Sequence, residues 1–117
     1  MANRTVQLVF SNPVAGKDDE FNDWYDNVHV PEILAIPGVL SAQRYALCET
    51  KILRDAGRTA AHQYLCIYEM EGDVDAIMAK ITEAVGSGAI NMSETLDLAD
   101  STLSFWTPRG SKVEASQ

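Results

Sequence analysis

Four stretches of the chain have the residue pattern of β-strands, in which successive side chains point to opposite faces, and turn residues separate them. In the first stretch, TVQLVFS, the side chains of Val6, Leu8 and Phe10 fall on one face. The third stretch, HQYLCIYEM, is apolar on both faces, which is typical of a strand in the middle of a sheet. The four predicted strands cover residues 5–11, 39–48, 62–70 and 101–106.

Two other stretches have the 3.6-residue period of an amphipathic helix. The first is capped by Asp18 and should run to about residue 29. Pro31 should then break it, because proline suits the first turn of a helix but not its interior, and a short second turn should follow over PEILAI. The second helix begins after the cap residue Asp73 and should end at Gly86. Its apolar stripe comprises Val74, Ile77, Met78, Ile81 and Val85.

The element order is therefore β-α-β followed by β-α-β. A long hairpin with a polar loop over residues 49–61 joins the two units. Two right-handed crossovers in this order predict a ferredoxin-like α+β fold, a βαββαβ four-stranded antiparallel sheet with both helices on one face. We expect a single domain over residues 1–107 and a flexible C-terminal tail over residues 108–117.

The sheet face opposite the helices is expected to be rich in aromatic side chains. Three tyrosines and a tryptophan are too much apolar area to leave in water on a small domain. A second subunit or a ligand should therefore cover this face, and a homodimer is the simpler of the two explanations. The side chains assigned to this face are Thr5, Gln7, Val9, Tyr45, Tyr64, Tyr68 and Trp106.

Composition narrows the range of partners. The 117 residues carry a net charge of −8, which disfavours binding to nucleic acid or to anionic membranes. No apolar run approaches the roughly 20 residues that a membrane span requires, and the N-terminus lacks a signal-peptide pattern. The two cysteines, Cys48 and Cys66, lie in apolar strand-like surroundings and are expected to be buried, reduced thiols. We therefore expect a cytoplasmic protein.

The motifs of common cofactor and metal sites are missing from the sequence. AGKDDE lacks the second glycine and the hydroxyl of a phosphate-binding loop. No spacing of cysteine and histidine suits zinc, and no serine lies in a nucleophile elbow. We expect neither a cofactor nor a metal.

The stretch EFNDWYDNVHVPEIL carries the residues best suited to chemistry. His29 can exchange protons near neutral pH, and Asp26, three residues earlier on the helix, could orient it. Tyr25 or Tyr64 could donate a hydrogen bond to negative charge that develops on a substrate. Alternatively, His29 only complements the dipole at the end of the helix, and the aromatic residues belong to the core. The residues expected to contact a ligand are Trp24, Glu32, Arg44, Tyr64 and Tyr68.

The run W-Y-x-x-V-H-x-P-E-I, the segment IPGVLSAQRY and the final F-W-x-P, with the element order over residues 5–107, resemble the dimeric α+β barrel superfamily. Within it they are similar to the ethyl tert-butyl ether degradation (EthD)-like group. The resemblance implies two subunits whose sheets pack face to face, a pocket in each subunit between sheet and helices, and a functional role for His29. Related barrels include cofactor-free cyclases, dehydratases, isomerases and monooxygenases, together with haem-degrading enzymes. The second histidine that some relatives place near the first is missing here, since His62 is the only other one, which disfavours a haem site.

Two functions are consistent with these features. The first is a small cofactor-independent enzyme that performs proton-transfer chemistry, of the isomerase, cyclase, dehydratase or oxygenase type. Its substrate would be an apolar aromatic or polyketide-like metabolite, and His29 its general acid or base. The second is a binding or accessory protein, in which the same pocket holds a hydrophobic molecule without reaction. A closed apolar cavity bordered by His29 favours the first function, and a polar or collapsed pocket favours the second.

Overall fold

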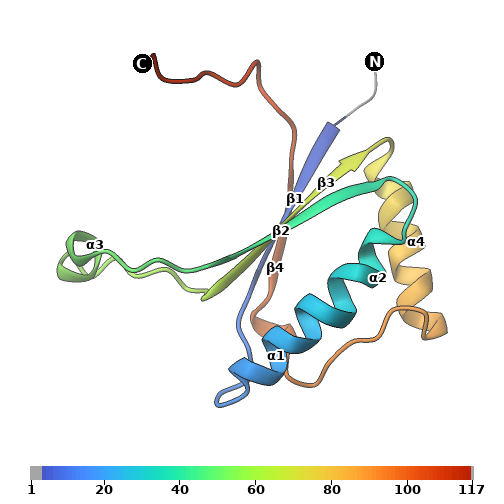
Figure 1. The fold of residues 1–117 in the computed structure, drawn as a ribbon, viewed down its shortest axis with the longest axis horizontal. Coiled ribbons are helices and arrows are strands. Elements are labelled where there is room, and N and C mark those ends of the chain that lie inside the picture. The colour runs from blue at the N-terminus through green and yellow to red at the C-terminus, as the bar shows by residue number, and fades with distance from the viewer. Residues whose placement is uncertain (1–3, 117) are drawn as a thin grey trace.

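The computed structural model describes residues 4–116. A single sheet carries helices on one side, and a long hairpin arm extends from one end of the sheet (Figure 1). The elements are, in order, β1 Arg4–Ser11, α1 Asp18–Trp24, the π-helical segment η1 Tyr25–His29, α2 Val30–Leu34, β2 Val39–Ala46, α3 Lys51–Asp55, β3 Tyr64–Glu71, α4 Val74–Ser87, the 3₁₀ turn η2 Leu98–Asp100 and β4 Thr102–Trp106.

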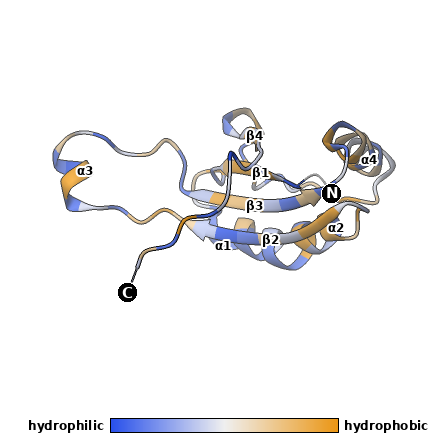
Figure 2. Ribbon diagram, turned by 90° about the horizontal axis from the view of Figure 1, so that it is seen from above, coloured by the Kyte–Doolittle hydropathy of each residue, from blue (hydrophilic) through white to orange (hydrophobic). Residues whose placement is uncertain are grey.

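The four strands form one antiparallel sheet in the order β2-β3-β1-β4, so β3 is a central strand as the sequence predicts. The helical run from α1 to α2 and the helix α4 both lie on the same side of this sheet (Figure 2). This arrangement confirms the ferredoxin-like α+β fold. Between sheet and helices lies the core, in which the side chains of Phe21 and Met70 are completely buried.

The prediction of which sheet face meets the helices was wrong for β1 and β3. Gln7 pairs with Tyr68 on β3, and both side chains are buried under the helices, with 4% and 2% of their area exposed. Five side chains assigned to the open face therefore face the helices: Thr5, Gln7, Val9, Tyr64 and Tyr68.

The apolar face of β1, with Val6, Leu8 and Phe10, is the open one. Tyr45 and Trp106 share this open face with them, as predicted, and remain 49% and 58% exposed. Both faces of β1 and β3 contain apolar residues, so their alternation alone does not determine which face packs against the helices. The face left open is thus richer in aliphatic side chains than expected.

The first helical run contains no break at Pro31. Backbone angles stay helical from α1 to α2, and η1 widens the turn so that the Val30 N–H donates to the carbonyl of Tyr25, five residues earlier. This change of register occurs just before Pro31, where the missing N–H and the ring would otherwise interrupt an α-helix. The helix begins at Asp18 after Lys17, whose side chain makes no capping bond, so the predicted Asp18 cap was also wrong by one residue.

The second helix, α4, has the predicted start and a later end. The Asp73 carboxylate accepts a hydrogen bond from the Asp75 N–H at 3.1 Å, as expected of a cap residue. Gly86 lies inside the helix, and Gly88 ends it in the left-handed conformation with φ of 85°. Ile77 and Ile81 of the predicted stripe are buried.

The hairpin between β2 and β3 projects as an arm well beyond the rest of the sheet and carries the short helix α3 at its tip (Figure 1). Cys48 lies on this arm and is exposed, contrary to the expectation of two buried thiols, whereas Cys66 is buried. Beyond β4, residues 107–116 form no helix or strand and are exposed. Among the described residues, no helix is long and apolar enough to cross a lipid bilayer.

Candidate functional site

A cavity of about 170 Å³ lies between the sheet and the helices. Its floor comes from β1, β3 and β4, and its sides come from the first helical run, from α4 and from the segment that follows α4. The lining side chains are predominantly apolar. They belong to Gln7, Val9, Trp24, Tyr25, His29, Ile33, Tyr68, Met78, Ile81, Val85, Met92, Leu96, Leu98, Ser101 and Leu103.

His29 is held at this cavity by two aromatic neighbours. Its imidazole stacks on the Trp24 ring, with centroids 4.6 Å apart and planes 26° from parallel. The edge of the Tyr25 ring meets it at 5.1 Å and 85°. The wider turn of η1 determines where these side chains point, and π-helical turns are often found at functional sites.

The imidazole of His29 is neutral at physiological pH. Burial lowers its pKa from 6.5 to about 4, and the nearby Glu32 carboxylate opposes this only in part. The Nδ1 atom is buried and has no hydrogen-bond partner among the described residues. A neutral imidazole in an apolar cavity can accept a proton or a hydrogen bond from a bound molecule.

Two phenols contribute further polar groups to the cavity. Tyr25 and Tyr68 are each 2% exposed, and burial raises the pKa of both, so each keeps its proton and can donate a hydrogen bond. The Tyr68 hydroxyl is buried and makes no hydrogen bond of good geometry within residues 4–116, although the Tyr25 hydroxyl lies close to it. Cys66 lies beside the two phenols, and burial raises the pKa of its thiol as well.

Asp26 does not contact His29, so the expected orienting pair is absent. Its carboxylate instead accepts a hydrogen bond from Arg44 Nη1 at 2.8 Å, so Arg44, expected to contact a ligand, pairs with an acidic residue. Arg44 also donates to the Asn22 side chain at 2.9 Å and lies over the Tyr25 ring at 4.3 Å. The helix places Asp26 and His29 three residues apart, but the η1 turn and Arg44 direct them to different neighbours.

Tyr64 lies outside the cavity, beside Arg44 and its partner Asn22. Its hydroxyl accepts a hydrogen bond from Asn22 Nδ2 at 3.1 Å and donates to Asp18 at 3.4 Å. The guanidinium of Arg44 lies 5.4 Å from its ring centroid. The predicted site residues therefore separate into a cavity group and an Arg44 cluster. Trp24, Tyr25, His29 and Tyr68 form the former, and Asp26, Arg44 and Tyr64 the latter.

Glu32 has a structural partner that the sequence did not indicate. Its two carboxylate oxygens accept hydrogen bonds from the backbone N–H of Asn91 at 2.9 Å and from its side-chain amide at 3.0 Å. The indole N–H of Trp24 donates to the Asn91 carbonyl at 2.9 Å. Residues 89–101 are thereby tied to the first helical run and close one wall of the cavity through Met92, Leu96 and Leu98.

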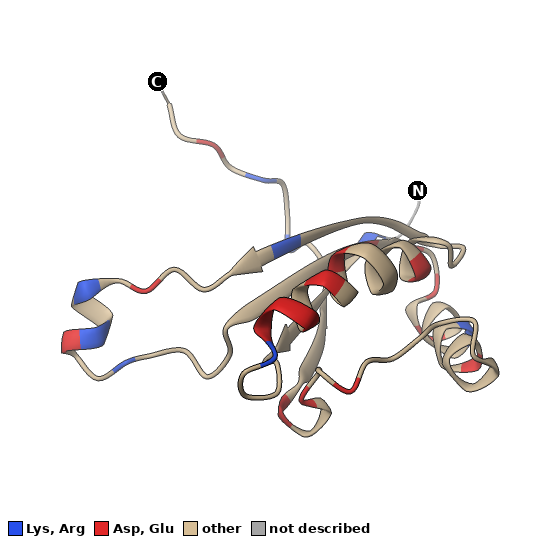
Figure 3. Cartoon of the chain, turned by 60° about the horizontal axis from the view of Figure 1, so that its bottom comes forward, with Lys and Arg blue, Asp and Glu red and all other residues tan. Residues whose placement is uncertain are grey.

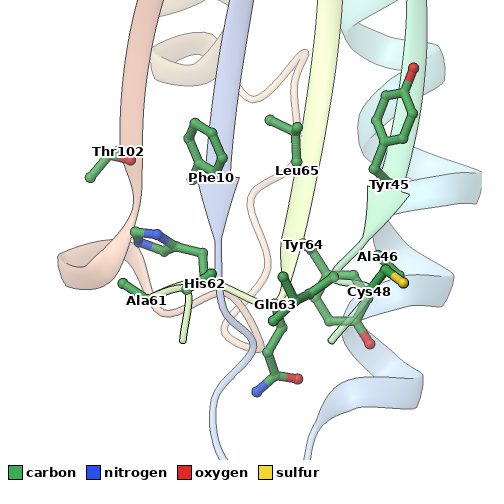
Figure 4. Close-up of a pocket in the computed structure, with 12 residues that line it drawn as sticks. Phe10, Tyr45, Ala46, Cys48, Ala61, His62, Gln63, Tyr64, Leu65 and Thr102 are labelled. Carbon is green, nitrogen blue, oxygen red and sulfur yellow. The ribbon is translucent and has the colours of Figure 1, made fainter. Parts of the chain in front are cut away.

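A larger groove of about 410 Å³ lies on the open face of the sheet, at the root of the arm (Figure 4). Phe10, Leu65 and Tyr45 form its apolar part, and His62 borders it. His62 donates from Nε2 to the Asp100 carbonyl at 2.6 Å, so this imidazole is engaged by the backbone. The inner cavity is the better candidate site, because it is more enclosed than the groove and gathers several buried groups that can transfer or share protons.

Residues 4–116 contain no group of three or more histidine, cysteine, aspartate or glutamate side chains placed to hold a metal ion.

No protein-family model and no curated protein sequence matches the chain. Its fold, however, is similar to that of several solved structures. A candidate monooxygenase from Shewanella loihica PV-4 superimposes with a TM-score of 0.63 at 14% identity, over 95% of this chain and 99% of the other. An EthD family protein from Bacillus halodurans C-125 gives 0.56 at 16% identity, over 89% and 98%.

A mutant form of SnoaB, a cofactor-independent oxygenase from Streptomyces nogalater, gives a TM-score of 0.54 at 16% identity, over 97% and 100% of the two chains. These likenesses confirm the predicted structural resemblance to an EthD family protein. The chain shares with these solved structures a ferredoxin-like α+β fold.

Proposed function

We propose that this protein is a small cofactor-independent enzyme that performs proton-transfer chemistry on an apolar, oxygen-bearing aromatic metabolite. His29 carries this proposal, because its neutral imidazole borders a predominantly apolar cavity beside Trp24 and Tyr25. The fold neighbours support the same general kind of activity, since they include a cofactor-independent oxygenase.

His29 acts as a base in this mechanism rather than as an acid, because burial keeps its imidazole unprotonated at neutral pH. A carbon acid bound in the cavity gives its proton to the imidazole, and the resulting enolate or phenolate oxygen accepts a hydrogen bond from a cavity phenol. Tyr68 and Tyr25 can supply this bond, since their raised pKa values keep both protonated. The negative charge of the bound oxygen in turn favours the imidazolium that forms.

The test uses deuterium exchange, which requires only the proton-transfer step. Acetophenone in D₂O loses its methyl protons slowly, and NMR follows their replacement. We expect the wild-type protein to accelerate this exchange and His29→Ala to reduce the acceleration by about 10² to 10⁴-fold. His62→Ala, which changes the histidine outside the cavity, serves as the control. Equal acceleration by wild type and His29→Ala would contradict the proposal.

A binding protein without catalysis is the second candidate. The observation that favours it is the pairing of Asp26 with Arg44, which leaves Nδ1 of His29 without a hydrogen-bonded carboxylate to orient it. Binding of acetophenone without any acceleration of exchange would identify this alternative as correct.

The molecule is also proposed to act as a homodimer joined through the open face of the sheet. Tyr45 and Trp106 lie exposed on this face, next to the aliphatic side chains of β1 and β3. A second copy would bury this apolar surface, and the inner cavity of each subunit would remain on the other side of its sheet.

A further inference from the structure

The volume of the inner cavity and one buried hydroxyl narrow the class of ligand. We propose that the cavity binds a single-ring aromatic compound with one hydrogen-bond-accepting oxygen, and that the phenol of Tyr68 recognises this oxygen. The inference deepens the proposed function, because it concerns the same cavity, but it concerns binding and does not require turnover.

Size is the first argument. A cavity of about 170 Å³ compares with the roughly 150 Å³ of an engineered apolar cavity that binds benzene, and it lies well below the roughly 300–1,000 Å³ of pockets for drug-sized ligands. Its inner wall belongs to the packed core, because Ile33 and Ile81 are both buried, whereas its outer side opens to solvent beside Leu98 and Leu103, which are 70% and 51% exposed. The inner part has room for about one ring, so a system of three or more fused rings would have to extend out of the cavity.

The second argument is the position of an unsatisfied donor. The Tyr68 hydroxyl is buried in a side chain that is 2% exposed and makes no hydrogen bond of good geometry, although the Tyr25 hydroxyl and the Cys66 thiol lie close to it. Buried hydroxyls nearly always have a partner, and the absence of one destabilises the fold. Since Tyr68 comes from the central strand β3 and lines the cavity, a ligand oxygen inside the cavity can supply this partner.

The remaining surroundings favour an aromatic ligand over water. Most of the lining is apolar, with Gln7, Ser101 and the neutral His29 as its other polar residues besides the tyrosines. A water molecule held there would find few partners, whereas a ring could pack against Trp24, Met78 and the aliphatic side chains. Aromatic and thioether groups pack well against a flat ring.

Four related compounds test the proposal in binding titrations with the wild-type protein. Acetophenone and ethylbenzene have nearly the same shape, but only acetophenone has an oxygen. We expect acetophenone to bind roughly fivefold to tenfold more tightly. In the series acetophenone, 2-acetylnaphthalene and 2-acetylanthracene the acetyl group is constant and the ring count rises. Affinity should fall with ring count, and the three-ring compound should not bind.

Two variants assign the effects to residues. Tyr68→Phe removes the donor with little change in shape, so it should bind acetophenone and ethylbenzene with similar affinity. Met78→Ala removes side-chain volume from the cavity wall and should admit 2-acetylnaphthalene more readily than the wild type does. If Tyr68→Phe does not fold, the preference of the wild-type protein for acetophenone over ethylbenzene still decides whether an oxygen is recognised.

Equal binding of one-ring and three-ring compounds would overturn the size argument, and equal binding of acetophenone and ethylbenzene by the wild type would overturn the role of Tyr68. A preference that persists in Tyr68→Phe would also exclude this donor. These outcomes differ from a failure of the proposed catalysis, in which binding depends on ring count and on Tyr68 but deuterium exchange is not accelerated.

Discussion

The carboxylate of Glu32 holds Asn91 by two hydrogen bonds across 59 residues of sequence, one from the backbone N–H at 2.9 Å and one from the side-chain amide at 3.0 Å. This contact joins the end of the first helical run to the segment after α4. Because that segment supplies Met92, Leu96 and Leu98 to the cavity, Glu32 determines the shape of one cavity wall without lining it.

Glu32→Ala should therefore lower the free energy of unfolding by about 1–3 kcal/mol, since it removes two hydrogen bonds to a charged acceptor. It should also weaken ligand binding in the cavity, because the segment over residues 89–101 loses one of its attachments. Chemical denaturation and ligand titration measure the two effects. Glu20→Ala, an exposed change on α1, is the control. An affinity equal to that of the wild type would show that Glu32 does not support the cavity.

The lowered pKa of His29 predicts a dependence of stability on pH. The folded state binds this proton with a pKa of about 4 and the unfolded state with the ordinary value near 6.5. Between these values the unfolded state binds more protons, so acidification favours unfolding, and the contribution is constant above about pH 6.5. The free energy of unfolding should thus fall by roughly 1–3 kcal/mol from pH 6.5 to pH 4 through this residue.

His29→Gln should remove this part of the pH dependence, as measured by urea denaturation at several pH values. His62→Gln retains His29 and should retain the slope that His29 causes. If the wild type and His29→Gln lose stability in parallel on acidification, His29 is not buried as a neutral imidazole.

Gly38 precedes β2 and contacts α4 closely. Its φ is +99°, and a Cβ atom there would lie 2.7 Å from Ile77 Cδ1. Gly38→Ala should lower the free energy of unfolding by roughly 2–4 kcal/mol, from backbone strain and from the clash. Gly16 also has a positive φ, of 79°, but open space around it, so Gly16→Ala measures the strain alone. Thermal melts in which the two variants are equally destabilised would contradict the close contact with α4.

The sequence predicted the order and type of the main elements, because each has a clear local period. The stripe on α4 is an example, since its residues Ile77 and Ile81 are both buried. The face that β1 presents to the helices was not predictable in this way. Val6 and Val9 are apolar and lie on opposite faces, so only the packing of the helices decides which face is covered.

Only part of the candidate site was predictable, because a local pattern indicates contacts within one element but not contacts between distant segments. The aromatic residues and His29 share one helical run, so their proximity follows from local spacing. The roles of Glu32 and Asn91 depend on a contact between distant segments, and the segment over residues 89–101 has no periodic pattern that would indicate its position. The pairing of Asp26 with Arg44 likewise joins a helix to a strand.

The hairpin arm should be dispensable for the fold. Its tip helix α3 is capped locally by Thr50 and held by the ion pair between Lys51 and Asp55, and Ile52 is 77% exposed (Figure 3). Replacing residues 50–58 by a short glycine-containing turn should change the melting temperature by only a few degrees, because the root of the arm and its bonds to Asn12 remain. If this replacement strongly lowers the melting temperature or dissociates the dimer, a second copy covers α3.

The open sheet face provides the last prediction. Tyr45 and Trp106 lie exposed on it, and β1 and β3 add Val6, Leu8 and Ile67 between them. A charge placed here would be buried without a partner in a dimer joined through the sheets, and such burial costs several kcal/mol. Stable interfaces of this kind commonly bury about 2,000 Å² or more, which four strands with apolar side chains can supply.

Tyr45→Glu and Trp106→Glu should therefore convert the dimer to a monomer while each subunit keeps its fold. Analytical ultracentrifugation at micromolar concentration measures the mass, and circular dichroism measures the fold. Leu34→Glu, at an exposed apolar position on α2 on the helical side of the sheet, should remain dimeric. A wild-type protein that sediments as a monomer would exclude the sheet interface. A dimer that dissociates with Leu34→Glu and not with Trp106→Glu would place the interface on the helices instead.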